Sequence, residues 1–292
     1  MVKSHSRKIG DAVIACFCLL VIFVCLFPIL NLVARSLSDP MAIVNRRVSL
    51  LPVDPTLDSY KYVFQDKSFS RSMVWSIFLT AVCTIASLAM TVLCAFPLIY
   101  DNLKGKSVIN IIIIFTMYFS AGTIPNYLLV KNLGLLNNPL VLIIPNCLSV
   151  FNMIILRSFF YGVPDSLRES AELDGANPFT VLTRIYLPLS MPVLATLALF
   201  YAVGRWNGFS DALLYLTSAP AYHPIQLKLY NIINNLSSIE IATQEGLSGA
   251  APATGDGMKA AAVMFATVPI LVVYPWLQRY FISGVTIGAV KG

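Results

Sequence analysis

Uncharged, largely apolar stretches alternate along this chain with short polar segments. A helix needs about 20 apolar residues to cross the hydrocarbon core of a membrane, and six of the stretches are about that long. Each therefore predicts one membrane-spanning helix. The predicted spans cover residues 12–34, 72–100, 107–130, 139–156, 185–204 and 260–278, and the fourth lies in an uncharged run that begins at Asn132.

The first predicted span begins close to the amino terminus, where a signal peptide would also lie. The apolar region of a signal peptide is only about 7–15 residues long and is followed by a small-residue cleavage site. The stretch from Ala12 to Ala34 is longer, and no such site follows it. We therefore expect it to remain in the protein as a span.

The composition agrees with a membrane protein. Only 12% of the 292 residues are charged and 57% are hydrophobic, whereas a soluble domain has about 25% charged residues. The six cysteines all lie inside apolar runs, so we expect them to pack as small hydrophobic side chains rather than to form a disulfide framework. The sequence predicts an all-α, multi-pass membrane protein with a single transmembrane domain over residues 1–292.

The residues give no support for an enzyme. Two histidines cannot build a metal site by themselves, and no serine–histidine–aspartate arrangement has local support. The pattern G-x-x-x-x-G-K-[ST], which cradles nucleotide phosphates in ATPases, does not occur. The net charge of +6 is not gathered in a basic cluster, so no nucleic acid is expected. We predict no catalytic residue, no metal and no cofactor bound by this chain.

The basic residues bear on the orientation of the spans. With the amino terminus inside, ten Lys and Arg residues fall on each side of the membrane, so their total does not decide the orientation. The positive-inside rule gives most weight to short loops and to the first span. Three basic residues in the amino-terminal tail and two in the loop 101–106 favour a cytoplasmic amino terminus. Segment 158–188 then faces the cytoplasm, and loop 207–259 faces the outside.

Segment 158–188 is the most charge-dense part of the chain. Ser166 and Glu169 have the spacing of a capping box at a helix N-terminus. Gly175 suits a left-handed helix stop, and Asn177 followed by Pro178 is typical of a new helix start. The sequence therefore predicts a short helix, a sharp turn and a second helix that leads into the fifth span.

One face of the first of these helices is made mostly of small residues, which would let a partner helix approach closely. A solvated hairpin whose acids balance nearby basic residues is the alternative. The residues of this face are Leu167, Ser170, Ala171 and Asp174.

A spacing pattern in the same segment resembles the EAA loop of bacterial ABC importer permeases, E-A-A-x3-G-x9-I-x-L-P. It is formed here by Glu169-Ser170-Ala171, Gly175 and Ile185-Tyr186-Leu187-Pro188, and Ser170 in place of alanine is its one departure. The sequence R-S-L-S after the first span, the pair Trp206-Asn207 and the tail GVTIGAVKG extend the resemblance over essentially the whole chain. These features are similar to the carbohydrate branch of the ABC importer permeases. Within that branch, the chain resembles the second, shorter permease of maltose-type systems, and in particular the LplC- and YtcP-like subgroup.

The resemblance implies a type I permease fold of six spans in the bacterial cytoplasmic membrane. It also implies a second homologous permease, two ATPase subunits that carry ATP and Mg, an extracytoplasmic solute-binding protein and an oligosaccharide substrate. The loop must face the ATPases, which again places the amino terminus inside. The residues implied to couple the chain to ATP hydrolysis are Glu169, Ser170, Ala171, Asp174, Gly175, Ile185, Leu187 and Pro188.

Polar residues on two predicted spans are candidates for the translocation path. Polar groups that face lipid are costly, so both sets are expected to point inward. They then either line a sugar-facing cavity or hydrogen-bond packed helices together. On the third span Thr116, Ser120, Thr123 and Tyr127 recur at steps of 4, 3 and 4, as if on one helical face; on the fourth the residues are Asn146, Ser149 and Asn152.

Two other functions stay open at this point. A permease for peptides or amino acids would share the loop, and neighbouring genes would separate it from a sugar permease. An ion-coupled carrier needs ionisable groups inside the membrane, and the six stretches contain none. The sugar itself is not defined, since the basic chain leaves room for uronate-containing as well as neutral oligosaccharides. Arg205 and Asp211, beside the fifth span, are expected to reach toward water, or else to shape an outer gate or the contact with the binding protein.

Overall fold

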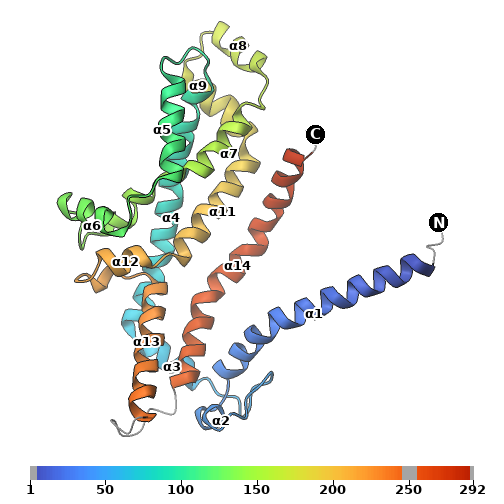
Figure 1. Ribbon diagram of the computed structural model, residues 1–292, viewed down its shortest axis with the longest axis vertical. Coiled ribbons are helices and arrows are strands. Elements are labelled where there is room, and N and C mark those ends of the chain that lie inside the picture. Colours follow the sequence, from blue (N-terminus) through green and yellow to red (C-terminus); the bar gives the residue numbers. More distant parts are fainter. Residues whose placement is uncertain (1–4, 245–254, 290–292) are drawn as a thin grey trace. The chain divides into compact units, whose positions relative to one another are not determined.

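The computed structural model describes residues 5–244 and 255–289, and within them every regular element is a helix (Figure 1). The predicted all-α fold is thus confirmed. The longer helices are α1 (His5–Ser36), α4 (Lys67–Ala95), α5 (Lys106–Tyr118), α6 (Thr123–Asn132), α7 (Val150–Phe160), α8 (Asp165–Leu173), α11 (Met191–Asn207), α13 (Ile225–Gln244) and α14 (Gly255–Ala289). The shorter helices are α2 (Pro40–Val44), α3 (Asp58–Gln65), α9 (Pro178–Val181), α10 (Leu187–Leu189), α12 (Ser210–Tyr215), the 3₁₀ turns η1 (Pro97–Ile99), η2 (Pro139–Leu142), η3 (Ile144–Asn146) and η5 (Pro220–Tyr222), and the π-helical turn η4 (Leu182–Tyr186).

Three of the six predicted spans are continuous helices. They cover Val13–Ser36, Lys67–Ile99 and Gly255–Val273. The other three are pairs of helices that are bent at a short break, so the chain has six spans when each pair crosses the membrane as one. The bends are 115° between α5 and α6, 44° between the segment Pro139–Asn146 and α7, and 83° between the segment Pro178–Leu189 and α11.

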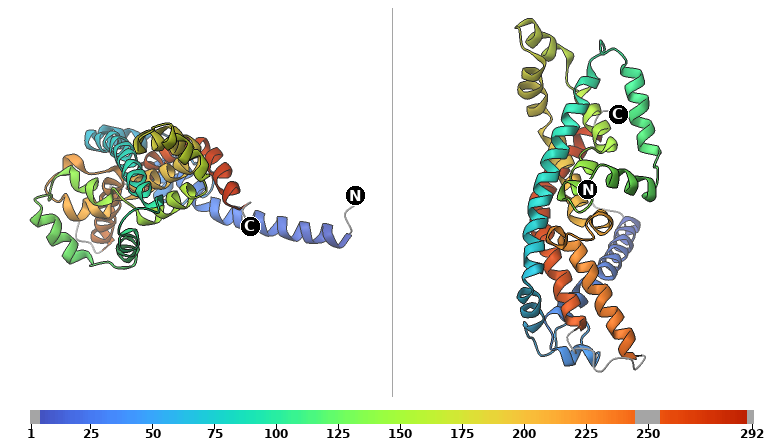
Figure 2. Two further views of the ribbon diagram at one scale, coloured as in Figure 1. Left: turned by 90° about the horizontal axis from the view of Figure 1, so that it is seen from above. Right: turned by 90° about the vertical axis from the view of Figure 1, so that its left-hand side faces the viewer.

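The sharpest bend divides the third predicted span. The chain leaves α5 at Phe119 and re-enters a helix at Thr123, and the two helices diverge (Figures 1 and 2). Gly122, just before α6, has φ 90° and ψ 173°, a backbone conformation that is essentially restricted to glycine. The sequence expectation of one helix over residues 107–130 is therefore wrong.

By its contacts the chain forms two compact units. The first consists of residues 1–70 and 228–268. In it, α3 and the start of α4 meet α14 through Phe265, whose ring lies 5.0 Å from Phe64 and 5.5 Å from Phe69. The apolar residues 13–30 of α1 are all exposed, as expected for a helix whose surroundings are lipid or another subunit.

The second unit consists of residues 71–227 and 269–292 and contains the larger core. An aromatic cluster at its centre joins three segments that are far apart in sequence. The ring of Phe96 lies 5.4 Å from Tyr186 and 6.4 Å from Phe160, and Phe160 lies 5.3 Å from Tyr186, all nearly edge to face. Since such pairs contribute energy beyond area burial, the cluster fixes the end of α4 against α7 and against the turn η4.

Candidate coupling loop and translocation cavity

The predicted helix–turn–helix of segment 158–188 is present, but its first helix begins earlier than the capping box implies. The N-cap of α8 is Pro164, which makes no side-chain capping bond. Ser166 and Glu169 both lie inside the helix, so the predicted capping box is wrong. The fixed φ of proline and the extended ψ of 129° at Pro164 place the helix start before Asp165. The carboxylate of Asp165 instead forms an ion pair with Arg168, with 3.1 Å between Oδ1 and Nη2.

The turn that follows α8 agrees with the sequence prediction. Gly175 has φ 83°, the left-handed conformation in which a residue without Cβ carries no strain. Asn177 is the N-cap of α9, and its side-chain oxygen accepts from the backbone N–H of Thr180 at 2.8 Å. Pro178 occupies the first helical turn, where its missing N–H costs nothing.

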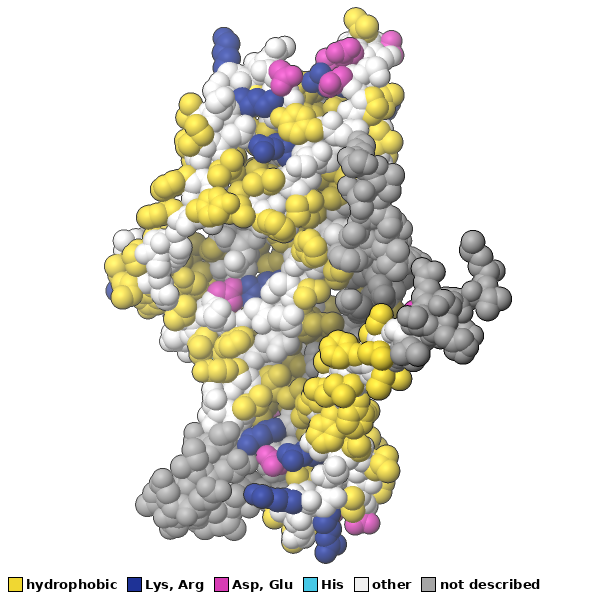
Figure 3. Space-filling model, turned by 45° about the vertical axis from the view of Figure 1, so that its right-hand side comes forward, with side chains coloured by type: hydrophobic (Ala, Val, Ile, Leu, Met, Phe, Trp, Pro, Cys, Tyr) yellow, Lys and Arg dark blue, Asp and Glu magenta, His cyan; other side chains and the backbone are white. Residues whose placement is uncertain are grey.

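Some residues of the EAA-like pattern are exposed, and others pack on the core of the second unit. Glu169, Ser170, Asp174 and Gly175 are exposed, as is Pro188. Ala171, Ile185 and Leu187 are partly buried and pack on the core of the second unit. The small face of α8 thus serves in part to bring the helix close to its own chain. Exposed apolar side chains lie beside the exposed acids: Leu173 is 89% and Phe179 is 69% exposed, and acidic side chains gather at the top of the face drawn in Figure 3.

Arg168 turns from α8 toward the rest of the second unit. Its side chain is only 17% exposed, and its guanidinium carbon lies 5.0 Å from the ring centroid of Tyr100, just after η1. Burial and the nearby Glu172 carboxylate raise the pKa of Tyr100. In the adjoining turn, a hydrogen bond from Lys106 lowers the pKa of Asp101. The contact between Arg168 and Tyr100 therefore joins α8 to the segment that follows α4 and η1.

The pattern ends in an irregular helix. The π-helical turn η4 immediately precedes α10, which contains Pro188. A proline inside a helix lacks the N–H that would bond four residues back, and its ring clashes with that carbonyl. A wider turn at this point relieves the conflict, and π turns of this kind are frequent at functional sites. After Ser190 the chain bends by 83° into α11.

A polar cavity of about 640 Å³ lies elsewhere in the second unit. It contains all three path candidates of the fourth predicted span. Asn146 lies in η3, Ser149 is the N-cap of α7 and Asn152 lies in the first turn of α7, so these three residues surround a helix start. The cavity is lined by Cys83, Ser87, Pro145, Asn146, Leu148, Ser149, Phe151, Asn152, Phe200, Tyr201, Gly204, Arg205, Gly208, Ser210 and Asp211.

The hydroxyl group of Tyr201 is held by two polar partners in the wall of this cavity. It accepts from the backbone N–H of Ser149 at 3.1 Å and lies 2.7 Å from Oγ1 of Thr91. Thr91 itself donates to the carbonyl oxygen of Ser87 at 2.7 Å, so the tyrosine hydroxyl donates to Thr91. The hydroxyl is thus fully engaged, which fixes the orientation of the Tyr201 ring.

Arg205 and Asp211 form a largely buried ion pair, and not the water-directed charges that sequence suggests. The side chains are 6% and 20% exposed. Nη1 and Nη2 of Arg205 contact the two carboxylate oxygens at 2.5 and 3.1 Å. Nη1 also donates to the carbonyl oxygen of Leu142 at 3.3 Å, and Nη2 to that of Gly208 at 2.9 Å. The pair therefore connects the end of α11 to α12 and to η2.

The path candidates of the third predicted span are not brought together. Thr116 lies in α5 and Ser120 in the break, whereas Thr123 and Tyr127 lie in α6 beyond the 115° bend. The expectation that they share one helical face is wrong, because the step of 3.6 residues per turn is interrupted at Gly122. Tyr127 stacks on Tyr215 at 6.1 Å instead.

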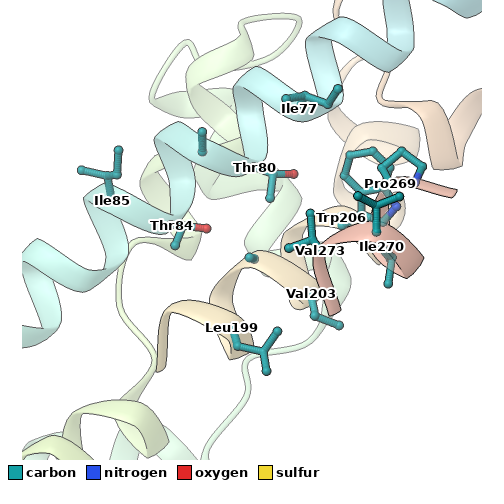
Figure 4. Close-up of a pocket in the computed structure, with 13 residues that line it drawn as sticks. Ile77, Thr80, Thr84, Ile85, Leu199, Val203, Trp206, Pro269, Ile270 and Val273 are labelled. Carbon is teal, nitrogen blue, oxygen red and sulfur yellow. The ribbon is translucent and has the colours of Figure 1, made fainter. Parts of the chain in front are cut away.

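A second cavity in the same unit, of about 630 Å³, is almost wholly apolar (Figure 4). It lies between α4, α11 and α14, and Trp206 contributes to its wall. Trp206 is only 6% exposed. The labelled residues that line it are Ile77, Thr80, Thr84, Ile85, Leu199, Val203, Trp206, Pro269, Ile270 and Val273.

Sequence reasoning missed Ser87, Phe200 and Tyr201 as lining residues of the polar cavity. Ser87 and Tyr201 are polar residues inside long apolar runs, which was the available signal. Ser87 also has periodic polar partners on its own helix, since Thr80, Thr84, Ser87 and Thr91 recur at steps of 4, 3 and 4. For Tyr201 the tertiary structure supplies the polar partners from other segments, Thr91 and Ser149.

The chain combines apolar spans, an exposed helix–turn–helix in segment 158–188 and a polar cavity among the helices, as a membrane permease does. A family model described as "Binding-protein-dependent transport system inner membrane component" matches residues 66–287. The chain belongs to this family, and is therefore a membrane permease of a binding-protein-dependent importer.

Two relatives from Bacillus subtilis (strain 168) match nearly the full length of the chain. Protein LplC is 42% identical over 291 residues, covering 99% of this chain and 98% of LplC. The polygalacturonan/rhamnogalacturonan transport system permease protein YtcP is 37% identical over 287 residues, covering 98% and 100%. The resemblance inferred from sequence is confirmed.

A solved structure also matches. It is described as a crystal structure of a bacterial ABC transporter involved in the import of the acidic polysaccharide alginate. Its matched chain superposes with a TM-score of 0.87 at 33% identity, covering 96% of this chain and 99% of that one. The type I permease fold expected from sequence is confirmed.

Proposed function

We propose that this chain is a permease subunit of an ATP-driven importer of oligosaccharides, and that its cargo includes acidic, uronate-containing ones. The observation that carries this proposal is the full-length match to the alginate importer at 33% identity. The 37% identity with a polygalacturonan and rhamnogalacturonan permease supports it independently. All three named polymers contain uronic acids. A peptide or amino acid permease, the alternative that the loop alone leaves open, gains no support from these relatives.

The proposed assembly contains a second, homologous permease, two ATPase subunits and an extracytoplasmic binding protein. ATP and Mg are held by the ATPase subunits. The amino terminus and segment 158–188 face the cytoplasm of a bacterium, and loop 207–259 faces outward, where it contacts the binding protein. Part of that loop, residues 245–254, lies outside the described residues.

In this proposal α8 is the element that receives the ATPase movement. The exposed surface of α8 supports this role. Exposed acids stand beside exposed Leu173 and Phe179, a combination that suits a protein interface. Three residues of the pattern, Ala171, Ile185 and Leu187, pack inward on the core. A segment that contacts a partner with its exposed face and its own core with these residues can transmit a displacement to the spans.

The polar cavity is proposed to form part of the translocation path. Asn146, Ser149 and Asn152 supply neutral hydrogen-bonding groups there, and Phe151, Phe200 and Tyr201 supply aromatic faces. This combination suits a hydroxyl-rich ligand. Thr116, Ser120, Thr123 and Tyr127 stay candidates for a different part of the path.

Reconstitution of the whole importer tests the proposed function. The chain is co-purified with its partner permease, ATPases and binding protein, and uptake into proteoliposomes is measured with uronate oligosaccharides, neutral oligosaccharides and peptides. We expect ATP- and binding-protein-dependent uptake of at least one uronate oligosaccharide. Uptake of peptides alone, or uptake driven by an ion gradient without ATP, would contradict the proposal.

A further inference from the structure

The charge arrangement of the polar cavity determines which part of a sugar it can contact. Among the described residues that line it, Arg205 is the only cation and Asp211 the only anion. They neutralise each other through the bidentate ion pair. The cavity therefore offers an entering ligand no net positive charge.

Arg205 also has no hydrogen-bond donor left for a ligand. Each of its terminal nitrogens carries two N–H groups, and all four find partners. Nη1 contacts Asp211 and the carbonyl of Leu142, and Nη2 contacts Asp211 and the carbonyl of Gly208. The remaining Nε is buried and has no partner, so a ligand in the cavity cannot reach it.

Asp211 and Asn146 are the more accessible polar groups of this wall. The Asp211 side chain is 20% exposed against 6% for Arg205, and Asn146 is exposed and donates to Oδ2 of Asp211 at 3.3 Å. A ligand carboxylate here would meet a carboxylate before it met the guanidinium. Each Asp211 oxygen already accepts two hydrogen bonds, from Arg205 and Asn146 at Oδ2 and from Arg205 and the backbone N–H of Ala212 at Oδ1. The Nδ2 group of Asn146 donates to Asp211 and to the carbonyl oxygen of Leu142. A ligand hydroxyl can therefore donate to Oδ1 of Asn146, whereas a carboxylate, which only accepts, finds no donor there.

We infer that this cavity is a subsite for the hydroxyl face of a sugar ring, bound by Oδ1 of Asn146, and that it excludes the carboxylate of a uronate, which would meet the Asp211 carboxylate and no donor. Tyr201, whose hydroxyl is held by Ser149 and Thr91, offers a fixed ring against which the apolar face of a sugar can lie. The inference rests on the proposed function. It further requires that the counter-charge for an acidic cargo come from the partner permease.

Protection of a single thiol tests this subsite in the assembled importer. Ser210 is exposed and lines the cavity, so Ser210→Cys is introduced after the six native cysteines are replaced. The rate of its modification by a water-soluble thiol reagent is measured against increasing concentrations of a uronate trisaccharide and of its carboxyl-reduced, neutral counterpart. We expect the neutral sugar to protect at an equal or lower concentration than the uronate.

Two further variants separate recognition from structure. Asn146→Ala is expected to raise the half-protecting concentration of both sugars by the same factor, about 5- to 10-fold for the loss of one hydrogen bond. A deoxy analogue that lacks the hydroxyl bound by Asn146 should show no further change in this variant, whereas a general distortion would affect all analogues alike. The matched control is Asn102→Ala, in an exposed turn, which should change nothing.

Two results would overturn the inference. Protection by the uronate but not by the neutral sugar would show that the cavity binds the carboxylate. Absence of protection by either sugar, in a complex that still imports it, would show that the cavity is not a sugar subsite. The proposed function is judged separately, by uptake in the same preparation, because thiol protection does not require transport.

Discussion

The guanidinium carbon of Arg168 lies 5.0 Å from the ring centroid of Tyr100. The first residue belongs to the exposed helix α8, and the second follows the long helix α4. A cation–π contact at a partly desolvated site contributes about 1–2 kcal/mol, and Arg168 also pairs with Asp165. Arg168 therefore adds a polar attachment between the proposed coupling helix and a membrane span to the packing of Ala171 on the core.

Arg168→Ala is expected to lower transport several-fold while ATP hydrolysis by the assembled complex persists, because α8 loses its polar attachment to α4 but keeps its exposed acids. Arg168→Lys should recover only part of the loss, since an ammonium lacks the planar face of a guanidinium. The measurement is sugar imported per ATP hydrolysed. Arg184→Ala, at an exposed position of the same segment, is the control, and an equal effect there would argue against a specific role of the Tyr100 contact.

Gly175→Val is expected to abolish transport while the protein still inserts in the membrane. No atom lies within 4 Å of a Cβ built at this position, so the cost comes from the left-handed backbone, about 1–2 kcal/mol. Gly175→Asn should retain much of the activity, because asparagine tolerates this conformation better than a β-branched residue. Uptake is measured at matched protein abundance. Equal losses in both variants would mean that something other than backbone strain is responsible.

Glu169→Lys is expected to abolish transport through loss of the ATPase contact. The side chain is exposed and lies within α8, so charge reversal should leave the apparent melting temperature of the chain nearly unchanged. Co-purification of the ATPase subunits is the direct measurement. Asp101→Lys reverses an exposed charge outside the pattern and should leave the ATPases bound. Normal uptake by the Glu169 variant would refute the role given to this segment.

Removing one partner of the buried ion pair should be strongly destabilising. Asp211→Ala leaves the Arg205 guanidinium, with a side chain only 6% exposed, without its counter-charge, and such losses cost about 3–5 kcal/mol. The double replacement Arg205→Met with Asp211→Leu should recover most of that stability, since it removes both charges. Thermal unfolding in detergent compares the three proteins. A double variant as unstable as the single one would show that the charge pair itself is not the cause.

Tyr201→Phe tests the polar wall of the cavity without changing its shape. The hydroxyl accepts from the backbone N–H of Ser149, and an unsatisfied buried donor costs about 1–3 kcal/mol. We expect a lower melting temperature, with the aromatic ring retained. Tyr118→Phe, at a side chain that is 82% exposed, should be neutral, and a comparable decrease in that control would contradict the explanation.

The sequence by itself determined the class of this protein and several of its local turns and helix starts. Six uncharged stretches indicate spans because a bilayer requires a fixed apolar length, and this requirement does not depend on tertiary contacts. Gly175, Asn177 and Pro178 likewise adopt the predicted conformations, since left-handed turns and helix starts depend on a few neighbouring residues. The capping box at Ser166 was a local prediction that failed, because Pro164 begins the helix first.

Only the tertiary structure decided which polar residues meet. The break at Gly122 separates Thr116 from Tyr127, although a continuous helix would have aligned them. Arg205 and Asp211, six residues apart, form a buried pair because α11 ends and the chain turns back between them. Contacts of this kind depend on where bent helices lead the chain, and a periodicity within one span carries no information about a side chain on another.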